Sequence, residues 1–283
     1  MIRQFLLNCD LRAGRHVPLK LPAYIREQYL KDGQGIYSRE EWSHARRNGY
    51  RGAGVNSSEL DTDDRYLTRV FSSHVRNLHA ALRLLETFRF ESYDSVLELG
   101  CGEMIQAFAI KCAHPQLRYM ATDFDPFVVE KCSRLPVLGQ IEKDVVDASQ
   151  LSVEQIAGFS LVVAWEMIYA LDDEKLLTVL RACRGANVPL LACTTQMIGP
   201  AQYIFRKMKN LWRRLEGVRV KGAGAAEPLR MHGWNPSPAY YARLARHAGL
   251  ELVRIWHPPA LLRGGDDFSY LLFAPDRTGS SPK

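Results

Sequence analysis

Two glycines one residue apart, Gly100 and Gly102, constrain the fold of this chain more than any other feature. Residues 96–99 (Val-Leu-Glu-Leu) before them have the composition of a buried strand, and residues 104–113 after them have that of a helix. Glycine lacks a Cβ atom, so the backbone can turn sharply there and approach a ligand closely. A helix that starts at such a turn offers its N–H groups to a carboxylate or phosphate. The stretch therefore predicts a strand, a tight turn and a helix that together cradle a nucleotide-type cofactor.

The details of this turn argue against a dinucleotide. A glycine three residues after Gly102 would complete the dinucleotide-binding pattern, but Ile105 stands there. The distinctive residue is instead an acid, Glu98, two residues before Gly100. An ionisable group inside an apolar strand is costly to bury, so we expect Glu98 to accept hydrogen bonds from the turn or to face a cationic ligand. An NAD-dependent oxidoreductase stays an alternative that the missing third glycine disfavours.

Apolar strands and helices alternate along the chain from residue 94 onwards. We expect strands at 94–99, 117–122, 137–142, 159–164, 188–194, 250–256 and 268–274, and helices at 104–113, 126–133, 152–157, 173–183 and 238–247. A further helix is expected from the acids at 61–64 to about residue 88. Continuous apolar strands between helices are typical of a parallel sheet that is covered on both faces. The pattern predicts a doubly wound α/β domain.

Three stretches resemble motifs of one family. Residues 96–102 (Val-Leu-Glu-Leu-Gly-Cys-Gly) resemble motif I of the class I S-adenosylmethionine-dependent methyltransferases. Residues 122–126 (Thr-Asp-Phe-Asp-Pro) resemble the second motif, and residues 159–171 resemble the fourth, from which Ser160 and Tyr169 depart. The resemblance implies a Rossmann-like, mostly parallel seven-stranded sheet with an antiparallel last strand. It also implies S-adenosylmethionine as cofactor, S-adenosylhomocysteine as product, and no metal.

The resemblance assigns roles to residues at three successive strand ends. Asp123, which follows Gly102 by 21 residues, would accept the two ribose hydroxyls, and Phe124 would lie against adenine. Asp144 would accept the adenine amino group, and the amide of Val145 would face a ring nitrogen. Trp165 would cover the methionine end of the cofactor, unless it is a buried packing residue. The predicted cofactor-binding residues are Glu98, Gly100, Cys101, Gly102, Asp123, Phe124, Asp144, Val145 and Trp165.

The acceptor is less constrained than the cofactor. We expect an O-methyltransferase that acts on a hydroxyl of a small molecule or glycan by in-line displacement at the methyl carbon. The candidate general bases are His232, in the loop before the helix at 238, and Tyr169; His257 is a weaker candidate. A non-catalytic methyltransferase-like binding protein stays open as an alternative.

Seven basic residues and one acid lie within residues 200–222, among apolar residues at helical spacing. This composition predicts a basic amphipathic helix within an insertion at 200–235. Three interpretations remain: a solvated covering helix, contact with an anionic membrane surface or lipid-linked acceptor, and contact with a phosphate-bearing or nucleic-acid acceptor. The sequence holds no recognised nucleic-acid module, so a nucleic-acid partner is not favoured.

Length and composition indicate one large domain with extensions. The chain has 283 residues, of which 47% are hydrophobic and 24% charged. We expect an irregular extension at 1–60, a methyltransferase domain at 61–275 and a flexible tail at 276–283. Six cysteines without a C-x-x-C pair indicate reduced thiols, and we expect no signal peptide and no bilayer-spanning stretch. These features favour a cytoplasmic protein.

Overall fold

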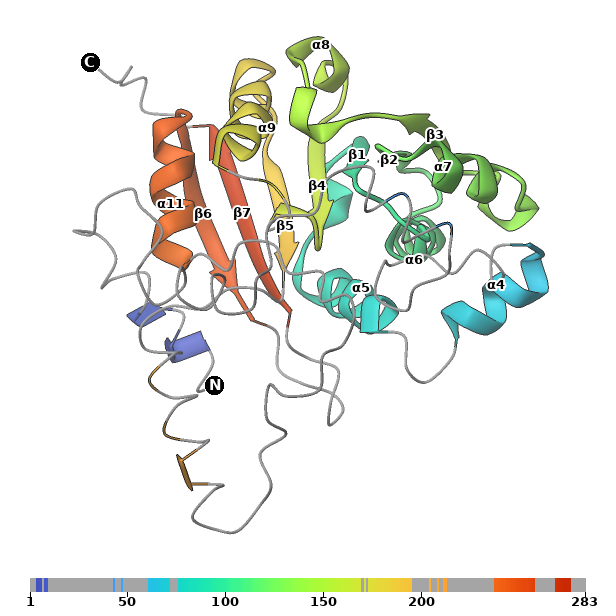
Figure 1. Ribbon diagram of the computed structural model, residues 1–283, viewed down its shortest axis with the longest axis horizontal. Helices are drawn as coiled ribbons and strands as arrows, with labels where there is room; N and C mark the ends of the chain where they lie inside the picture. The colour runs from blue at the N-terminus through green and yellow to red at the C-terminus, as the bar shows by residue number, and fades with distance from the viewer. Residues whose placement is uncertain are drawn as a thin grey trace.

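The computed structural model describes residues 4–6, 8–9, 43, 47, 61–71, 76–168, 171, 173–194, 204, 208, 211–212, 237–257 and 268–275. A central sheet with helices around it dominates this part of the chain (Figure 1). The predicted boundaries at residues 60 and 276 adjoin residues outside the description, so the division into extension, domain and tail stays a prediction.

The sheet has seven strands in the order β3-β2-β1-β4-β5-β7-β6. They are β1 (Ser95–Leu99), β2 (Arg118–Asp123), β3 (Glu142–Val145), β4 (Leu161–Trp165), β5 (Leu190–Thr194), β6 (Leu250–Trp256) and β7 (Ser269–Pro275). The first five strands pair in parallel, and β7 lies antiparallel between β5 and β6. The predicted fold class, including the antiparallel last strand, is therefore confirmed. The order of the strands reverses at β1, which lies between β2 and β4.

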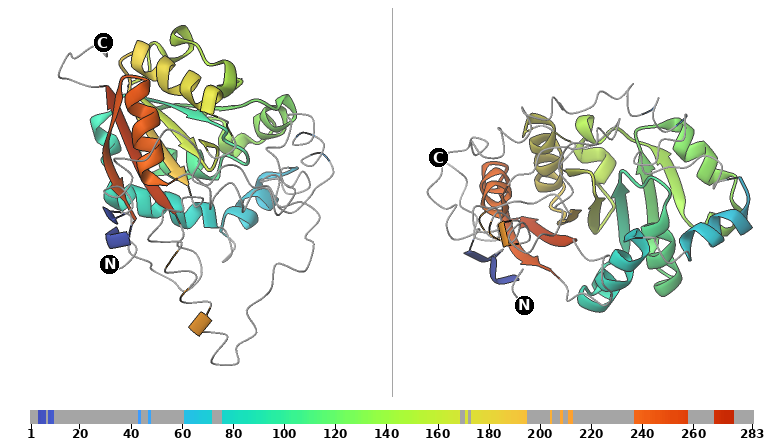
Figure 2. Two further views of the ribbon diagram at one scale, coloured as in Figure 1. Left: turned by 60° about the vertical axis from the view of Figure 1, so that its left-hand side comes forward. Right: turned by 60° about the horizontal axis from the view of Figure 1, so that its bottom comes forward.

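The described helices form two layers, one on each face of the sheet (Figure 2). They are α4 (Asp63–Val70), α5 (Arg76–Thr87), α6 (Ile105–Ala113), α7 (Pro126–Ser133), α8 (Val153–Ile156), α9 (Asp173–Gly185) and α11 (Pro238–His247), with 3-10 turns at Phe90–Ser92, Pro136–Leu138 and Ala148–Gln150. Helices α4 to α7 share one apolar core with the sheet, and α8, α9 and α11 share another. This covering on both faces explains why every residue of β1, β4 and β5 is buried.

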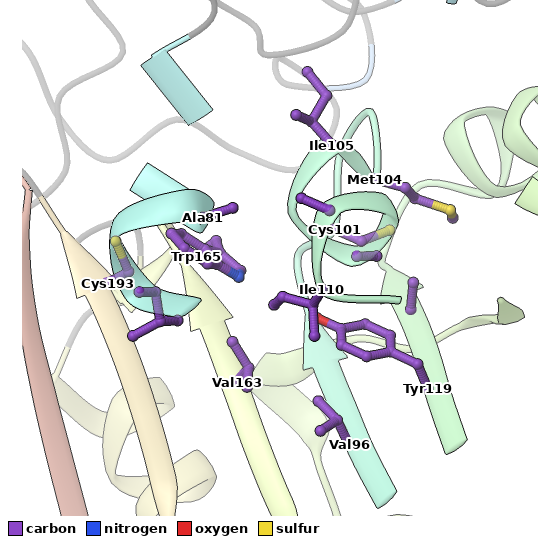
Figure 3. Packing of buried hydrophobic residues seen from close by; sticks show 14 of the residues in the cluster. Ala81, Val96, Cys101, Met104, Ile105, Ile110, Tyr119, Val163, Trp165 and Cys193 are labelled. Atoms are coloured by element: carbon purple, nitrogen blue, oxygen red, sulfur yellow. The ribbon is translucent and has the colours of Figure 1, made fainter. Parts of the chain in front are cut away.

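The core on the α6 side is built from alternate residues of the central strands. Val96, Tyr119 and Val163 point from the sheet toward α6, where Ile110 meets them (Figure 3). Because successive side chains of a strand point to opposite faces, Glu98 lies on the same face of β1 as Val96. The sheet and α6 therefore enclose an acidic group in an apolar layer.

The predicted strand at 137–142 is wrong. Residues Pro136–Leu138 form a 3-10 turn, and β3 begins only at Glu142. The strand β3 is the edge of the sheet, and its residues are mostly exposed and polar, so no apolar run marks it. The apolar residues that suggested a strand belong to the turn, whose Leu138 is fully buried.

The single long helix predicted up to residue 88 is also wrong. Helix α4 ends at Val70, where Phe71 leaves the helical conformation with φ −90° and ψ 3°, and α5 begins at Arg76. The two helices have different partners: Tyr66 of α4 packs on Phe108 of α6, whereas Ala80 of α5 accepts a hydrogen bond from Tyr270 of β7. Each segment is amphipathic, so the apolar residues keep a helical spacing through both segments. That spacing predicted one helix, although the structure has two.

The cysteines carry free thiols, as predicted, and four of them (101, 132, 183 and 193) are buried. Burial raises the pKa of the Cys132 thiol to about 12, so this thiol is not a nucleophile at neutral pH. In the described part of the chain, no helix combines the length and the apolar composition that crossing a membrane requires.

Candidate cofactor site

The turn between β1 and α6 is tight and left-handed. Gly100 has φ +71° and Gly102 has φ +51°, a region that favours glycine. A Cβ atom on Gly100 would lie 3.2 Å from Cβ of Met167, which follows β4. The Cys101 N–H donates to the Thr122 carbonyl at 2.9 Å and so ties the turn to β2. The predicted strand, turn and helix are therefore present, and the turn lies against the ends of both neighbouring strands.

The start of α6 has no side-chain cap. Its N-cap residue, Met104, is buried in a left-handed conformation with φ +55° and makes no capping hydrogen bond. By contrast, side chains cap each of the other α-helices whose N-cap residue is described, namely α4, α7, α8 and α11. Among the described residues, no N-cap side chain therefore competes with a ligand for the first N–H groups of α6, at the position where a helix binds anions best.

Asp123 joins the turn to the end of β2. Its carboxylate accepts the N–H of Gly102 at 3.1 Å through Oδ2 and the N–H of Asp125 at 3.1 Å through Oδ1. A carboxylate has about four acceptor positions, so this group has the chemistry that the ribose hydroxyls assigned to Asp123 require. Asp123 is fully buried, however. A ribose can reach the carboxylate only if the atoms that cover it move.

Glu98 is fully buried between the sheet and α6. The hydroxyl of Tyr119 donates to its Oε2 at 3.2 Å, and Oε1 has no hydrogen-bond partner among the described residues. Burial raises the pKa of the Glu98 carboxyl from its ordinary value of 4.5 to about 8; the hydrogen bond from Tyr119 opposes this rise, and the nearby Asp123 adds to it. A buried acid with one oxygen that no described residue contacts is a suitable partner for a cationic ligand, because a nearby positive charge would favour the ionised form of the carboxyl.

Asp144 and Val145 lie at the exposed end of the edge strand β3. The pairing of β2 with β3 places Asp144 beside Thr122 and Val145 beside Asp123. The Val145 N–H donates to Asp144 Oδ1 at 2.8 Å, so an adenine ring nitrogen would compete with that carboxylate for the amide. Phe124 is half-buried beside Asp123. The structure thus brings the residues assigned to ribose and adenine to one edge of the sheet.

Trp165 ends β4 and is a packing residue of the core. It is buried and meets Tyr270 edge-on, with ring centroids 6.2 Å apart and an interplanar angle of 87°. Figure 3 shows its ring on the α6 side of the sheet, and Nε1 has no hydrogen-bond partner among the described residues. The packing alternative is therefore supported, and contact with the methionine end of the cofactor stays a prediction.

Both candidate bases, Tyr169 and His232, lie outside the described residues and stay predictions. His257 follows β6, and its backbone N–H donates to Gln4 Oε1 at 2.8 Å. Glu166, after β4, adopts a left-handed conformation with φ +47°, and its N–H donates to the Cys193 carbonyl at 2.7 Å. Among the described residues, His, Cys, Asp and Glu form no group suited to hold a metal ion.

Helix α4 is the element that the sequence analysis missed at this site. Tyr66 is fully buried, and its hydroxyl has no hydrogen-bond partner among the described residues. Burial raises the pKa of this hydroxyl, and negative charge on Cys132, Glu103 and Glu98 raises it further, so these groups are neighbours. Arg69 pairs with the buried Glu103 at 3.5 Å. The spacing of Tyr66 and Val70 marked a buried helix face, but nothing in the sequence indicated what it covers.

Helix α4 is held over the turn by contacts that join distant parts of the chain. Asp63 accepts the Val137 N–H at 3.2 Å through both carboxylate oxygens. Lys131 of α7 donates to Asp61 at 2.8 Å, just before the helix begins. Together with the Arg69–Glu103 pair, these contacts hold α4 beside the residues that follow Gly102.

Comparisons with solved structures agree with this architecture. No protein-family model and no curated protein sequence matches the chain. Among solved structures, the mitomycin 7-O-methyltransferase MmcR is similar with a TM-score of 0.53 and 16% identity, over 94% of this chain and 75% of its own. Human N-acetylserotonin methyltransferase, solved with S-adenosylmethionine, has a TM-score of 0.53 and 14% identity, over 95% of this chain and 65% of its own.

LaPhzM has a TM-score of 0.52 and 16% identity, over 75% of this chain. The chain spans 59% of the length of LaPhzM, so LaPhzM is considerably longer than this chain. At such low identities, the likeness establishes the fold. The strand order and these neighbours together show that the chain has the fold of the class I S-adenosylmethionine-dependent methyltransferases, which the motif resemblance predicted.

Proposed function

We propose that this chain transfers a methyl group from S-adenosylmethionine to a hydroxyl of a small-molecule or glycan acceptor. The proposal rests on the turn between β1 and α6, where Gly102, the Asp123 carboxylate and the uncapped start of α6 meet. This turn lies where the strand order reverses, at the carboxyl ends of parallel strands, which is where open α/β sheets bind ligands. MmcR and human N-acetylserotonin methyltransferase share the fold and are named as methyltransferases of small molecules.

The residues present fit this cofactor. When bound, S-adenosylmethionine supplies an electrophilic methyl group on a sulfonium centre, and its methionine end carries an ammonium group. In the proposed arrangement, the unused Oε1 of Glu98 faces that cationic end. Asp123 binds the ribose and Asp144 the adenine amino group, while Phe124 packs on the ring. Gly100, Cys101 and Gly102 let the cofactor approach the backbone.

Ile105 and the buried Glu98 both argue against a dinucleotide-binding enzyme. Ile105, which stands where the dinucleotide pattern needs its third glycine, is buried in α6. Its side chain occupies the space that a third glycine would leave for close packing of helix and strand. A buried carboxyl beside the turn suits a cation better than it suits a pyrophosphate.

The protein contributes chiefly by alignment and exclusion of water. Holding two reactants in line can supply on the order of 7–11 kcal/mol of the barrier. A general base for a hydroxyl acceptor adds roughly 10²–10⁴-fold, and we assign this role to His232 or Tyr169. Trp165 is proposed to border the methionine end from β4, where its ring is already fixed by Tyr270.

Isothermal titration with S-adenosylhomocysteine tests the cofactor, with NAD as the control ligand. We expect micromolar binding of the former and none of the latter. Asp144→Ala should weaken binding about ten-fold or more, because one hydrogen bond to a charged group is lost. The matched control is Glu142→Gln, two residues earlier on the same strand. Asp123→Ala should abolish binding, but it also removes the acceptor of two backbone N–H groups, so Asp144→Ala is the cleaner variant.

Transfer of a labelled methyl group to a panel of phenols, alcohols and glycans then separates an enzyme from a binding protein. Label in any acceptor, lost in His232→Ala or Tyr169→Phe, supports the proposal. Binding without transfer to any acceptor would favour a non-catalytic binding protein. Absence of cofactor binding to a folded protein would contradict the methyltransferase function altogether.

A further inference from the structure

Four apolar residues of the basic insertion are helical and exposed. They are Ile204, Met208, Leu211 and Trp212, with 57%, 65%, 60% and 65% of their surface accessible. Positions spaced by four, seven and eight residues fall on one side of a helix. We call these four residues the apolar stripe.

The apolar stripe differs from the other exposed apolar side chains of the structure. Those others are dispersed over separate elements, as Phe71 after α4, Val145 on β3 and Val253 on β6 illustrate. Single exposed apolar residues are ordinary on a protein surface. Four large ones within nine residues, at a spacing that places them all on one side of a helix, are typical of a surface that binds something.

The sequence around the apolar stripe is strongly basic. Residues 200–222 contain seven basic residues and one acid, Glu216. From the sequence alone, a period of 3.6 residues per turn predicts that positions 206 and 213, both arginine, fall on the side opposite the stripe. An apolar side with leucine and tryptophan and a polar side rich in lysine and arginine is the pattern of helices that lie in a bilayer interface.

The exposed apolar stripe and the excess of basic residues together indicate which kind of partner binds here. A second copy of the chain or another protein would cover the apolar stripe but would not need the excess of cations. A nucleic acid would use the cations but leave the apolar stripe in water. An anionic bilayer uses both, because its headgroups attract the basic residues and its acyl boundary receives the apolar side.

We propose that the apolar stripe and its basic surroundings dock this protein on the surface of an anionic membrane. The helix lies in the plane of the interface, with Leu211 and Trp212 among the lipids and the basic residues at the headgroups. The proposal does not depend on the methyl-transfer function, since it concerns a different surface and a different ligand.

Co-sedimentation of the full chain with vesicles tests this docking. Vesicles of phosphatidylcholine with phosphatidylglycerol should carry the protein into the pellet, and vesicles of phosphatidylcholine alone should not. Each basic residue near an anionic surface strengthens binding about five-fold, so Arg213→Gln and Arg214→Gln should each weaken it about that much. Added salt should weaken it further, since the attraction is screened.

Leu211→Glu should abolish binding to the anionic vesicles. Val253→Glu is the matched control, because it places the same charge at an exposed apolar residue outside the stripe, and it should bind as the wild type does. Thermal melting of each variant shows that it is folded. Equal binding to both kinds of vesicle, no binding of the folded wild type, or a dimer that Leu211→Glu converts to a monomer would each overturn the proposal.

Discussion

Replacing Glu98 by glutamine removes the one buried acid of the central strand without changing its size. The carboxyl is fully buried, and its raised pKa of about 8 means that the folded protein holds it protonated over much of the neutral range. Glutamine resembles the protonated acid but cannot ionise. The variant therefore isolates what the titration of this one group does to the free energy of unfolding.

The direction and size of the effect follow from the two pKa values. Below about pH 4.5 the acid is protonated in both states and makes no difference. Between 4.5 and about 8 the unfolded chain ionises while the folded protein keeps its proton, so the wild type loses stability as the pH rises. At about 1.4 kcal/mol for each pH unit, the loss has an upper limit of about 5 kcal/mol, and above pH 8 it no longer grows.

Urea unfolding followed by circular dichroism, from about pH 5 to about pH 9, measures this loss. We expect Glu98→Gln to gain several kcal/mol relative to the wild type as the pH rises, while Glu91→Gln, an exposed acid, stays parallel to it. The variant should also bind S-adenosylhomocysteine more weakly, since it cannot offer a carboxylate to the ammonium group. Parallel pH curves for the wild type and Glu98→Gln would refute the assignment of a buried, protonated acid.

Three further substitutions, the first with a matched control, test the packing around the site. Gly100→Ala should lower the free energy of unfolding by about 1–3 kcal/mol in a melting experiment. Gly158→Ala shares the positive φ but has open space around it, so a smaller loss there isolates the contact with Met167. Tyr66→Phe removes a buried hydroxyl that has no partner among the described residues, so it should raise stability by about 1–3 kcal/mol. It should also weaken the binding of S-adenosylhomocysteine in titration, and unchanged affinity would remove Tyr66 from the site. Tyr270→Phe loses the 2.7 Å hydrogen bond to Ala80 and should cost about 1 kcal/mol in urea unfolding.

Local sequence patterns, which involve residues only a few positions apart, were sufficient to predict much of the fold. Asp125 and Pro126 mark the start of α7, and the helix runs over 126–133 as predicted. The bounds of β6, 250–256, also agree. The glycine turn could be predicted because its backbone conformation favours glycine, and the two glycines can be read directly from the sequence. Caps, turns and hydrophobic periods involve residues only a few positions apart, so they can be inferred without the fold.

Only the tertiary structure decided those features that depend on residues far apart in the sequence. The exposed edge strand β3 has no apolar period of its own, and its place comes from pairing with β2. Helix α4 covers the turn because Asp63 binds the Val137 N–H, 74 residues away. Likewise, the sequence determined by itself that an acid stands in the first strand, but only the fold left one of its oxygens without a hydrogen-bond partner in the described part of the chain. Burial and pairing are properties of the packed chain, and no local pattern records them.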